Sequence, residues 1–164
     1  MRHVGSVFYD SNYSIRRPLS SIQNFFRDLK YCLDRIRKGY CAKDLWEVDT
    51  WFLSVMPEML EDFNRCRNSY PNLFHEQCVQ NHEKELPVPR EKFLISGAQD
   101  FPELYEKIQD EANEAWGHIL KEMAFLMREA WHPGFKMEDG WEYRLQCQKK
   151  ALEMFQTYFN DLWD

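Results

Sequence analysis

Apolar residues recur every three or four positions between residues 20 and 39, which predicts an amphipathic helix. Ser20 or Ser21 is a suitable N-cap, because a serine hydroxyl can accept a hydrogen bond from the first turn. Gly39 is the natural stop, since glycine readily adopts the left-handed conformation that ends many helices. The apolar positions of this helix are Ile22, Phe25, Phe26, Leu29, Leu33 and Ile36.

The following segment, residues 43–67, is apolar on nearly every side when it is wound as a helix. Such a helix belongs inside a fold, so we expect it to be the central element. Asp49 falls on the same face as Phe52 and Met56. An unpaired buried carboxylate is costly, so we expect Asp49 to have an internal partner. Pro57 predicts a kink or a break within the helix.

The second half of the chain predicts two further helices. Asp100 and Glu103 form a capping-box pattern, and apolar residues keep helical spacing from there to Ala130. A last apolar-periodic segment begins at Trp141 and runs to the final residue.

Two stretches lack this periodicity. Residues 1–19 are expected to form an N-terminal arm, with a short strand near Val7–Tyr9 as one option. Residues 68–99 are expected to form a long irregular insertion, which could contain a strand at Phe93–Ser96 or a helical turn near Phe74–Val79. Four main helices and one irregular insertion predict an all-α fold, a single-domain helical bundle spanning all 164 residues.

Composition narrows the class of protein. A net charge of -6 disfavours direct binding to nucleic acid, which needs a basic face. Five scattered cysteines without a C-x-x-C pair indicate reduced thiols in a cytoplasm. We expect no association with a membrane, because no 18-residue stretch is apolar and free of charge. The aromatic content of 16% is high, so we expect some aromatic side chains to lie at the surface, where they favour contact with a partner.

The sequence offers little catalytic chemistry. His75, Cys78, His82 and Cys66 are possible zinc ligands, but their spacing matches no standard zinc finger, and we favour ordinary loop residues. The Glu-x-x-His pair that a di-iron bundle needs twice occurs once. A nucleophile elbow and a glycine-rich phosphate loop are both missing. We therefore predict no catalytic residue, no metal and no cofactor, and we favour a protein that is not an enzyme.

Asp49 has two interpretations. In the first, it pairs with Arg35 or Arg37, or accepts a hydrogen bond from a Trp indole, and fixes how the helices dock. In the second, it lies at the base of a cleft and contacts a ligand. Buried acids in helical bundles are mostly structural, which favours the first interpretation. The second gives the candidate binding residues Arg35, Arg37, Lys38, Tyr40, Trp46 and Asp49.

Four aromatic residues are candidates for contact with a partner, because they fall at predicted helix ends or in loops. They are Tyr70, Phe74, Trp131 and Trp163. The long apolar last helix would suit a homodimer as well as a monomer.

Three stretches, residues 31–60, 116–130 and 151–164, are similar to a group of uncharacterised small helical proteins encoded by bacteriophages and prophages of Gram-positive gut bacteria. The most specific run is R-x-x-R/K-G-Y followed by D-x-W-x-x-D. Here it is formed by Arg35, Lys38, Gly39, Tyr40, Asp44, Trp46 and Asp49. The resemblance covers about half of the chain and implies an origin in a phage, whereas it implies no mechanism because the group has no assigned activity.

Given that origin, we favour a non-enzymatic interaction protein that binds and inhibits a host defence component, such as a CRISPR effector, in the cytoplasm of the bacterial host. Its partner would be a host protein or a ribonucleoprotein complex. An acidic surface is attracted to a basic nucleic-acid-binding groove on such a partner. The alternatives are a module that sequesters a signalling nucleotide, and an accessory factor in phage replication or packaging.

Overall fold

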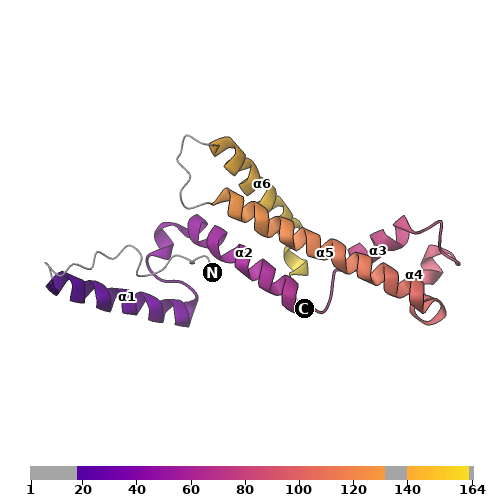
Figure 1. The fold of residues 1–164 in the computed structure, drawn as a ribbon, viewed down its shortest axis with the longest axis horizontal. Coiled ribbons are helices and arrows are strands. Elements are labelled where there is room, and N and C mark those ends of the chain that lie inside the picture. The colour runs from indigo at the N-terminus through magenta and orange to yellow at the C-terminus, as the bar shows by residue number, and fades with distance from the viewer. Residues whose placement is uncertain (1–17, 132–139, 163–164) are drawn as a thin grey trace. The chain divides into compact units, whose positions relative to one another are not determined.

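The structure is a computed structural model that describes residues 18–131 and 140–162 (Figure 1). Within these ranges it contains six α-helices, two short 3-10 helices and no strand, which confirms the all-α prediction. The strand considered at Val7–Tyr9 lies outside the described residues. In chain order the elements are α1 (Pro18–Lys38), η1 (Asp44–Trp46), α2 (Val48–Cys66), α3 (Asn72–Asn81), α4 (Arg90–Asp100), α5 (Pro102–Ala130), α6 (Trp141–Tyr158) and η2 (Phe159–Asp161).

The chain divides into two compact units, Met1–Met56 and Pro57–Asp164. The division falls inside α2, so the first half of this helix belongs to unit 1 and the second half to unit 2. It lies at the position where Pro57 predicts a kink, although α2 is helical on both sides of the proline. Whether the chain is a single-domain bundle stays a prediction.

In unit 1, α1 ends where the sequence predicts. Gly39 has a φ of +79°, a conformation that glycine adopts without steric cost, and its N–H donates to the carbonyl oxygen of Arg35 at 2.9 Å. The helix begins at Pro18, before the predicted serine caps. Proline fits a first helical turn, where its missing N–H would have no partner within the helix.

The prediction that α2 is buried on nearly every side is wrong. Leu53 and Leu60 are buried, but Phe52 and Met56 are only half-buried, and Met59 is exposed. An apolar residue can stay in contact with water at moderate cost, so apolar composition on all sides of a helix does not by itself place the helix in a core.

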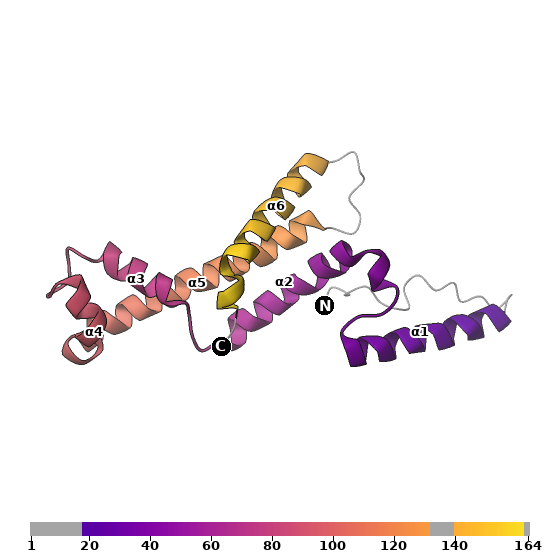
Figure 2. The same cartoon turned by 180° about the vertical axis from the view of Figure 1, so that it is seen from behind.

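In unit 2, α5 is the helix against which α3, α4 and α6 pack. Helices α3 and α4 lie along its first half and α6 lies along its second half, as both views show (Figures 1 and 2). The buried face of α5 includes Ile108, Trp116, Leu120, Met123 and Met127. The apolar periodicity of the sequence therefore predicted both the extent and the buried face of this helix.

Residues 68–99 are not an irregular insertion. They contain α3 and most of α4, and the strand considered at Phe93–Ser96 is part of α4. The helical turn considered near Phe74–Val79 is confirmed as part of α3. Pro71 and Pro89, which suggest a loop in the sequence, are the N-cap residues from which the two helices start.

The predicted cap of α5 is also wrong. Asp100 is the last residue of α4, and its carboxylate accepts a hydrogen bond from Ser96 Oγ at 2.6 Å. Phe101 is the N-cap of α5 and makes no side-chain capping hydrogen bond. None of the described helices is both long enough and apolar enough to cross a bilayer.

Candidate functional site

A polar clamp fixes the turn that follows α1. The guanidinium of Arg35 binds both carboxylate oxygens of Asp44, with Nε 3.0 Å from Oδ2. The backbone N–H of Cys41 donates to the same Oδ2 at 2.7 Å. Burial alone would raise the pKa of Asp44, but the hydrogen bonds from Arg35 and Cys41 outweigh it and hold that pKa below its ordinary value. Asp44 is therefore an ionised anchor that ties η1 to the last turns of α1.

This clamped segment, residues 39–48, carries exposed apolar side chains and is called the Trp46 turn below. Trp46 itself is 90% exposed. Leu45 and Val48 are each more than half exposed, and Tyr40 is also exposed. A segment whose backbone is fixed while its aromatic and apolar side chains face water has the features of a binding surface.

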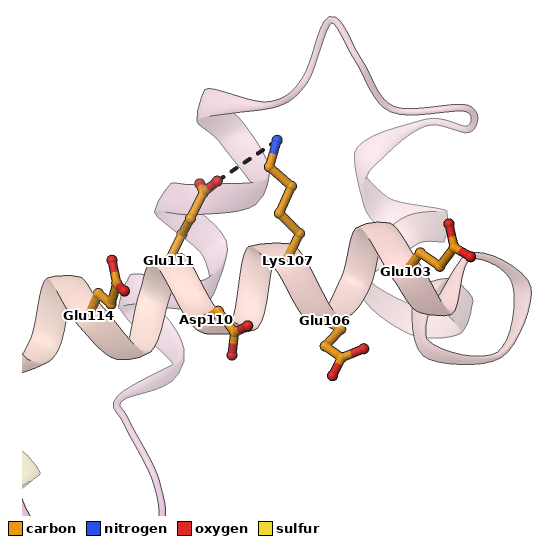
Figure 3. Close-up of a pocket in the computed structure, with 6 residues that line it drawn as sticks. All are labelled: Glu103, Glu106, Lys107, Asp110, Glu111 and Glu114. Atoms are coloured by element: carbon orange, nitrogen blue, oxygen red, sulfur yellow. Dashed lines mark ion pairs between the residues drawn. The ribbon is translucent and has the colours of Figure 1, made fainter.

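A second exposed surface runs along the first half of α5 and is acidic. Glu103, Glu106, Asp110 and Glu114 recur at intervals of three and four, so they lie on neighbouring turns of the helix (Figure 3). All four are exposed and line a shallow, open depression together with Glu111 and Lys107. We call these six residues the acidic face of α5. Lys107 pairs with Glu111 at 3.9 Å, and it is the one base among the six.

His82 joins the end of α3 to this acidic face. Its Nε2 lies 2.7 Å from Glu111 Oε2, and its Nδ1 lies 3.0 Å from Glu85 Oε2. The hydrogen bonds to Glu111 and then to Glu85 raise the pKa of His82 above its ordinary value, because both stabilise the charged ring. His82 therefore helps to hold α3 against α5, and this contact responds to pH.

The two histidines and two cysteines considered as zinc ligands have different surroundings, and His82 is paired with Glu85 and Glu111. His75 packs between Tyr70 and Tyr105, with Tyr70 Oη 3.3 Å from Nδ1, and burial lowers the pKa of His75. Cys78 is buried, whereas Cys66 is exposed at the end of α2. Within the described ranges, no three His, Cys, Asp or Glu side chains come close enough together to hold a metal ion.

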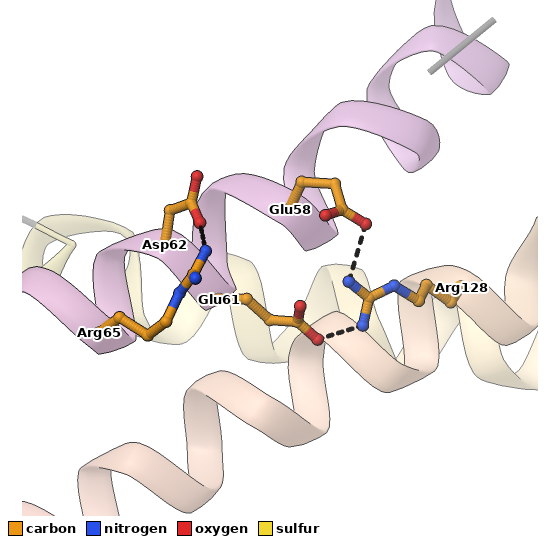
Figure 4. A network of polar contacts seen from close by, with 5 residues as sticks. All are labelled: Glu58, Glu61, Asp62, Arg65 and Arg128. Atoms are coloured by element: carbon orange, nitrogen blue, oxygen red, sulfur yellow. Dashed lines mark hydrogen bonds and ion pairs between the residues drawn. The ribbon is translucent and has the colours of Figure 1, made fainter. Parts of the chain in front are cut away.

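A network of charged residues links the second half of α2 to α5 (Figure 4). Arg128 binds Glu61 through Nη1, and its Nη2 lies 2.9 Å from Glu58 Oε1. The hydrogen bond from Arg128 lowers the pKa of Glu61. Arg65 pairs with Asp62 one turn further along α2, on an exposed part of that helix. This network is structural, since each charge already has a partner of opposite sign.

Of the predicted binding residues, Tyr40 and Trp46 lie in the Trp46 turn, whereas Arg35, Arg37 and Lys38 lie in the last turn of α1 and Asp49 lies in the first turn of α2. Arg35 is committed to Asp44, and Lys38 pairs with Asp34 at 3.2 Å. Arg37 is exposed. The expectation that Asp49 is buried is wrong, because Asp49 is exposed in the first turn of α2. The acid that pairs with Arg35 is instead Asp44, five residues earlier in the chain.

The candidate partner-contact aromatics have mixed environments. Phe74 is buried against Trp116 and Tyr158, with ring centroids 5.4 Å and 5.9 Å away, so it belongs to the core. Tyr70 and Trp131 are half-buried. Trp163 lies outside the described residues.

The acidic face of α5 is not among the surfaces predicted from the sequence. Its signal is present as acids spaced by three and four residues within a predicted helix, a pattern that is equally typical of an ordinary solvated surface. The exposure of the Trp46 turn had no sequence signal, because exposed and buried tryptophans look alike in a sequence.

Comparison with known proteins gives a partial match. A segment of 62 residues is 34% identical to small ribosomal subunit protein bS6 of Phytoplasma mali (strain AT). The match covers 38% of this chain and 55% of that protein, so the chain spans about half the length of the curated relative. No family model matches the chain. No solved structure matches it at a significant level.

Proposed function

We propose that this chain is a non-enzymatic interaction protein that uses the Trp46 turn to bind and inhibit a host defence complex, such as a CRISPR effector. The proposal includes the phage origin that the sequence resemblance implies. The observation that carries it is the 90% exposure of Trp46 on a turn fixed by the Arg35–Asp44 pair.

Tryptophan is enriched among the residues that contribute most to binding energy at protein interfaces. A fixed turn loses little conformational freedom on binding, so more of the contact energy remains as affinity. Tyr40, Leu45 and Val48 surround Trp46 in the sequence and add exposed apolar area to the same turn.

The acidic face of α5 supports the choice of partner class. A complex that binds guide RNA and DNA needs a basic groove, and an exposed row of carboxylates is attracted to such a groove at long range. The four exposed acids of this face provide that charge.

The test is binding of the purified chain to guide-RNA-loaded CRISPR effector complexes, measured on a sizing column and by inhibition of DNA cleavage. We expect Trp46→Ala to weaken binding at least about tenfold, as for a central interface tryptophan. Because Trp46 is so exposed, this change should leave the helical circular dichroism signal and the melting temperature unchanged. The matched control is Ile95→Ala, since Ile95 is 87% exposed on α4 and should not affect binding.

A second variant tests the fixed backbone of the turn. Asp44→Ala removes the acceptor of both Arg35 and the Cys41 N–H. We expect weaker binding, together with faster hydrogen exchange at the Cys41 amide. Binding by Trp46→Ala and Asp44→Ala that equals binding by the unmodified chain would refute the role of the turn. Absence of binding to every effector tested would refute this choice of partner.

The partial match to a ribosomal subunit protein favours a second candidate, association with the ribosome or its RNA. The described element best suited to a phosphate backbone is α1, which has five basic and two acidic residues. Co-sedimentation with ribosomes in a sucrose gradient, lost at high salt, would support this candidate over the first.

Sequestration of a signalling nucleotide, the alternative based on Arg35, Lys38, Tyr40 and Trp46, predicts a different result. A nucleotide bound by the folded chain alone would raise its melting temperature without any protein partner.

A further inference from the structure

Helix α1 exposes its apolar side. Six apolar residues, Leu19, Ile22, Phe26, Leu29, Leu33 and Ile36, are between 41% and 81% exposed. The side chains of α1 that are covered lie elsewhere on the helix: Asp28 is buried, and Asn24 and Arg35 are half-buried. An apolar stripe of this length on a soluble surface indicates a binding surface.

The spacing of the six residues specifies the kind of partner. They follow one another at intervals of three, four, three, four and three, which is the a and d pattern of a heptad repeat. In this register Leu19, Phe26 and Leu33 are a positions, and Ile22, Leu29 and Ile36 are d positions. Apolar residues that repeat at intervals of three and four form a stripe along one side of a helix, and helices of similar sequence pack together along such stripes. The line of contact is called the seam below.

We propose that the apolar stripe of α1 binds the same stripe on further copies of this chain, in a parallel coiled coil. The flanking residues support the parallel orientation. Lys30 and Arg37 occupy e positions, while Phe25 and Cys32 occupy g positions. In a parallel coiled coil the e residues of one helix face the g residues of the next, so each basic side chain meets an uncharged one.

An antiparallel arrangement would place e positions opposite e positions, so one flank of the seam would hold Gln23, Lys30 and Arg37 from both copies and no acidic residue. The composition of the seam also bears on the number of copies. Leucine at a with isoleucine at d favours more than two strands, and this holds for Leu19 with Ile22 and for Leu33 with Ile36.

The first experiment measures the mass of the full chain in solution by sedimentation equilibrium over a range of concentrations. We expect a reversible increase in mass above that of one chain. Leu33→Glu should weaken this association at least about tenfold, because it places a charge in the seam. Ile36→Lys is a second seam variant at an 81% exposed position, where a change should not prevent folding. Ile95→Glu is the matched control, since it adds the same charge at an exposed apolar residue of α4.

The second experiment tests the orientation by mild oxidation. In a background with Cys32 and Cys66 changed to serine, Ile36→Cys should form a disulfide between two copies only if the helices are parallel. A disulfide formed only when Leu19→Cys and Ile36→Cys proteins are mixed would show an antiparallel pair and overturn the orientation.

Three results would overturn the proposal itself. They are a single-chain mass at every concentration, association unchanged in both seam variants, and binding of the single chain to vesicles of anionic lipid through the same stripe. If the mass is that of a single chain at every concentration, protection of Leu33 and Ile36 from solvent labelling would show that the stripe is covered within one chain.

Discussion

The protonation of His82 is coupled to the docking of α3 against α5. Its ring bridges Glu85, just after α3, and Glu111 on α5, while the charge of nearby Lys107 opposes protonation. A raised pKa means that the folded state favours the charged ring more than the unfolded state does. The stabilisation is therefore complete below the ordinary pKa of 6.5 and is lost as the pH rises through the raised value.

We predict that His82→Gln destabilises the protein more at pH 6 than at pH 8. The difference between the two losses in the free energy of unfolding should be roughly 0.5–1 kcal/mol, because the ion pairs are partly solvated. Comparison with the unmodified chain is essential, since burial lowers the pKa of His75 and gives a pH dependence of opposite sign. Urea unfolding of the variant and of the unmodified chain, each at pH 6 and at pH 8, measures the free energies of unfolding that are compared.

His118→Gln is the matched control, because His118 is exposed on α5. An equal loss of stability at both pH values in the His82 variant would contradict the assignment of a proton-dependent contact.

Residue-scale features were predicted from the sequence only in part. The sequence predicts an acid paired with Arg35 as one option and favours Asp49 for that role, whereas the structure pairs Arg35 with Asp44. The chain turns back immediately after Gly39, which brings Asp44 to Arg35 and leaves Asp49 exposed one turn into α2. Helical periodicity identifies residues on one face of a helix, and it carries no information about a turn between helices.

At the scale of elements, unit 2 depends on α5 and on one aromatic cluster. Trp116 on α5 is fully buried and contacts Phe74 of α3 and Tyr158 of α6, each at a ring-centroid distance of 5.4 Å. One side chain therefore takes part in the packing of three helices.

We predict that Trp116→Ala lowers the free energy of unfolding by about 3–5 kcal/mol, the range for removal of a large buried aromatic side chain. Trp141→Ala is the matched control. Because Trp141 is 53% exposed at the start of α6, its removal should cost about 0.5 kcal/mol or less. Chemical unfolding followed by circular dichroism measures both, and similar losses in the two variants would contradict the central role of Trp116.

The long helices could be predicted because each has a long apolar stripe, and the short ones could not. Helix α3 buries Phe74, Cys78 and Val79, and α4 buries Phe93 and Gly97. Each of these helices spans only about three turns, which is too short a stretch of sequence to establish a period. Helices of 10 and 11 residues are also marginal alone, so packing against α5 determines their structure more than local sequence does.

At the scale of the whole molecule, the charge of -6 is unevenly distributed along the chain. The acidic face of α5 contains five acids and one base, whereas α1 contains five bases and two acids. In the net charge of the whole sequence, the basic residues of α1 partly cancel the acidic residues of α5. The net charge therefore shows only a modest acidic excess and indicates neither surface.

We predict that the double change Glu106→Lys and Asp110→Lys slows association with a partner that has a basic groove by about tenfold at low ionic strength. The effect should shrink at high salt, because exposed charges are then screened. Stopped-flow or surface-binding kinetics at several salt concentrations measure this.

Glu142→Lys with Glu153→Lys is the control, since it makes the same change in net charge on α6. If both double variants slow association equally, the total charge of the molecule matters, and the acidic face of α5 has no special role.

The position of α5 late in the sequence has a consequence for how the protein is made. Residues 72–100 emerge from the ribosome before the helix that α3 and α4 pack against has emerged. Both helices are then too short to persist alone, so their buried side chains, including Phe93, stay open to chaperones during translation. A stop codon introduced before residue 102 should therefore yield a fragment that proteases remove quickly.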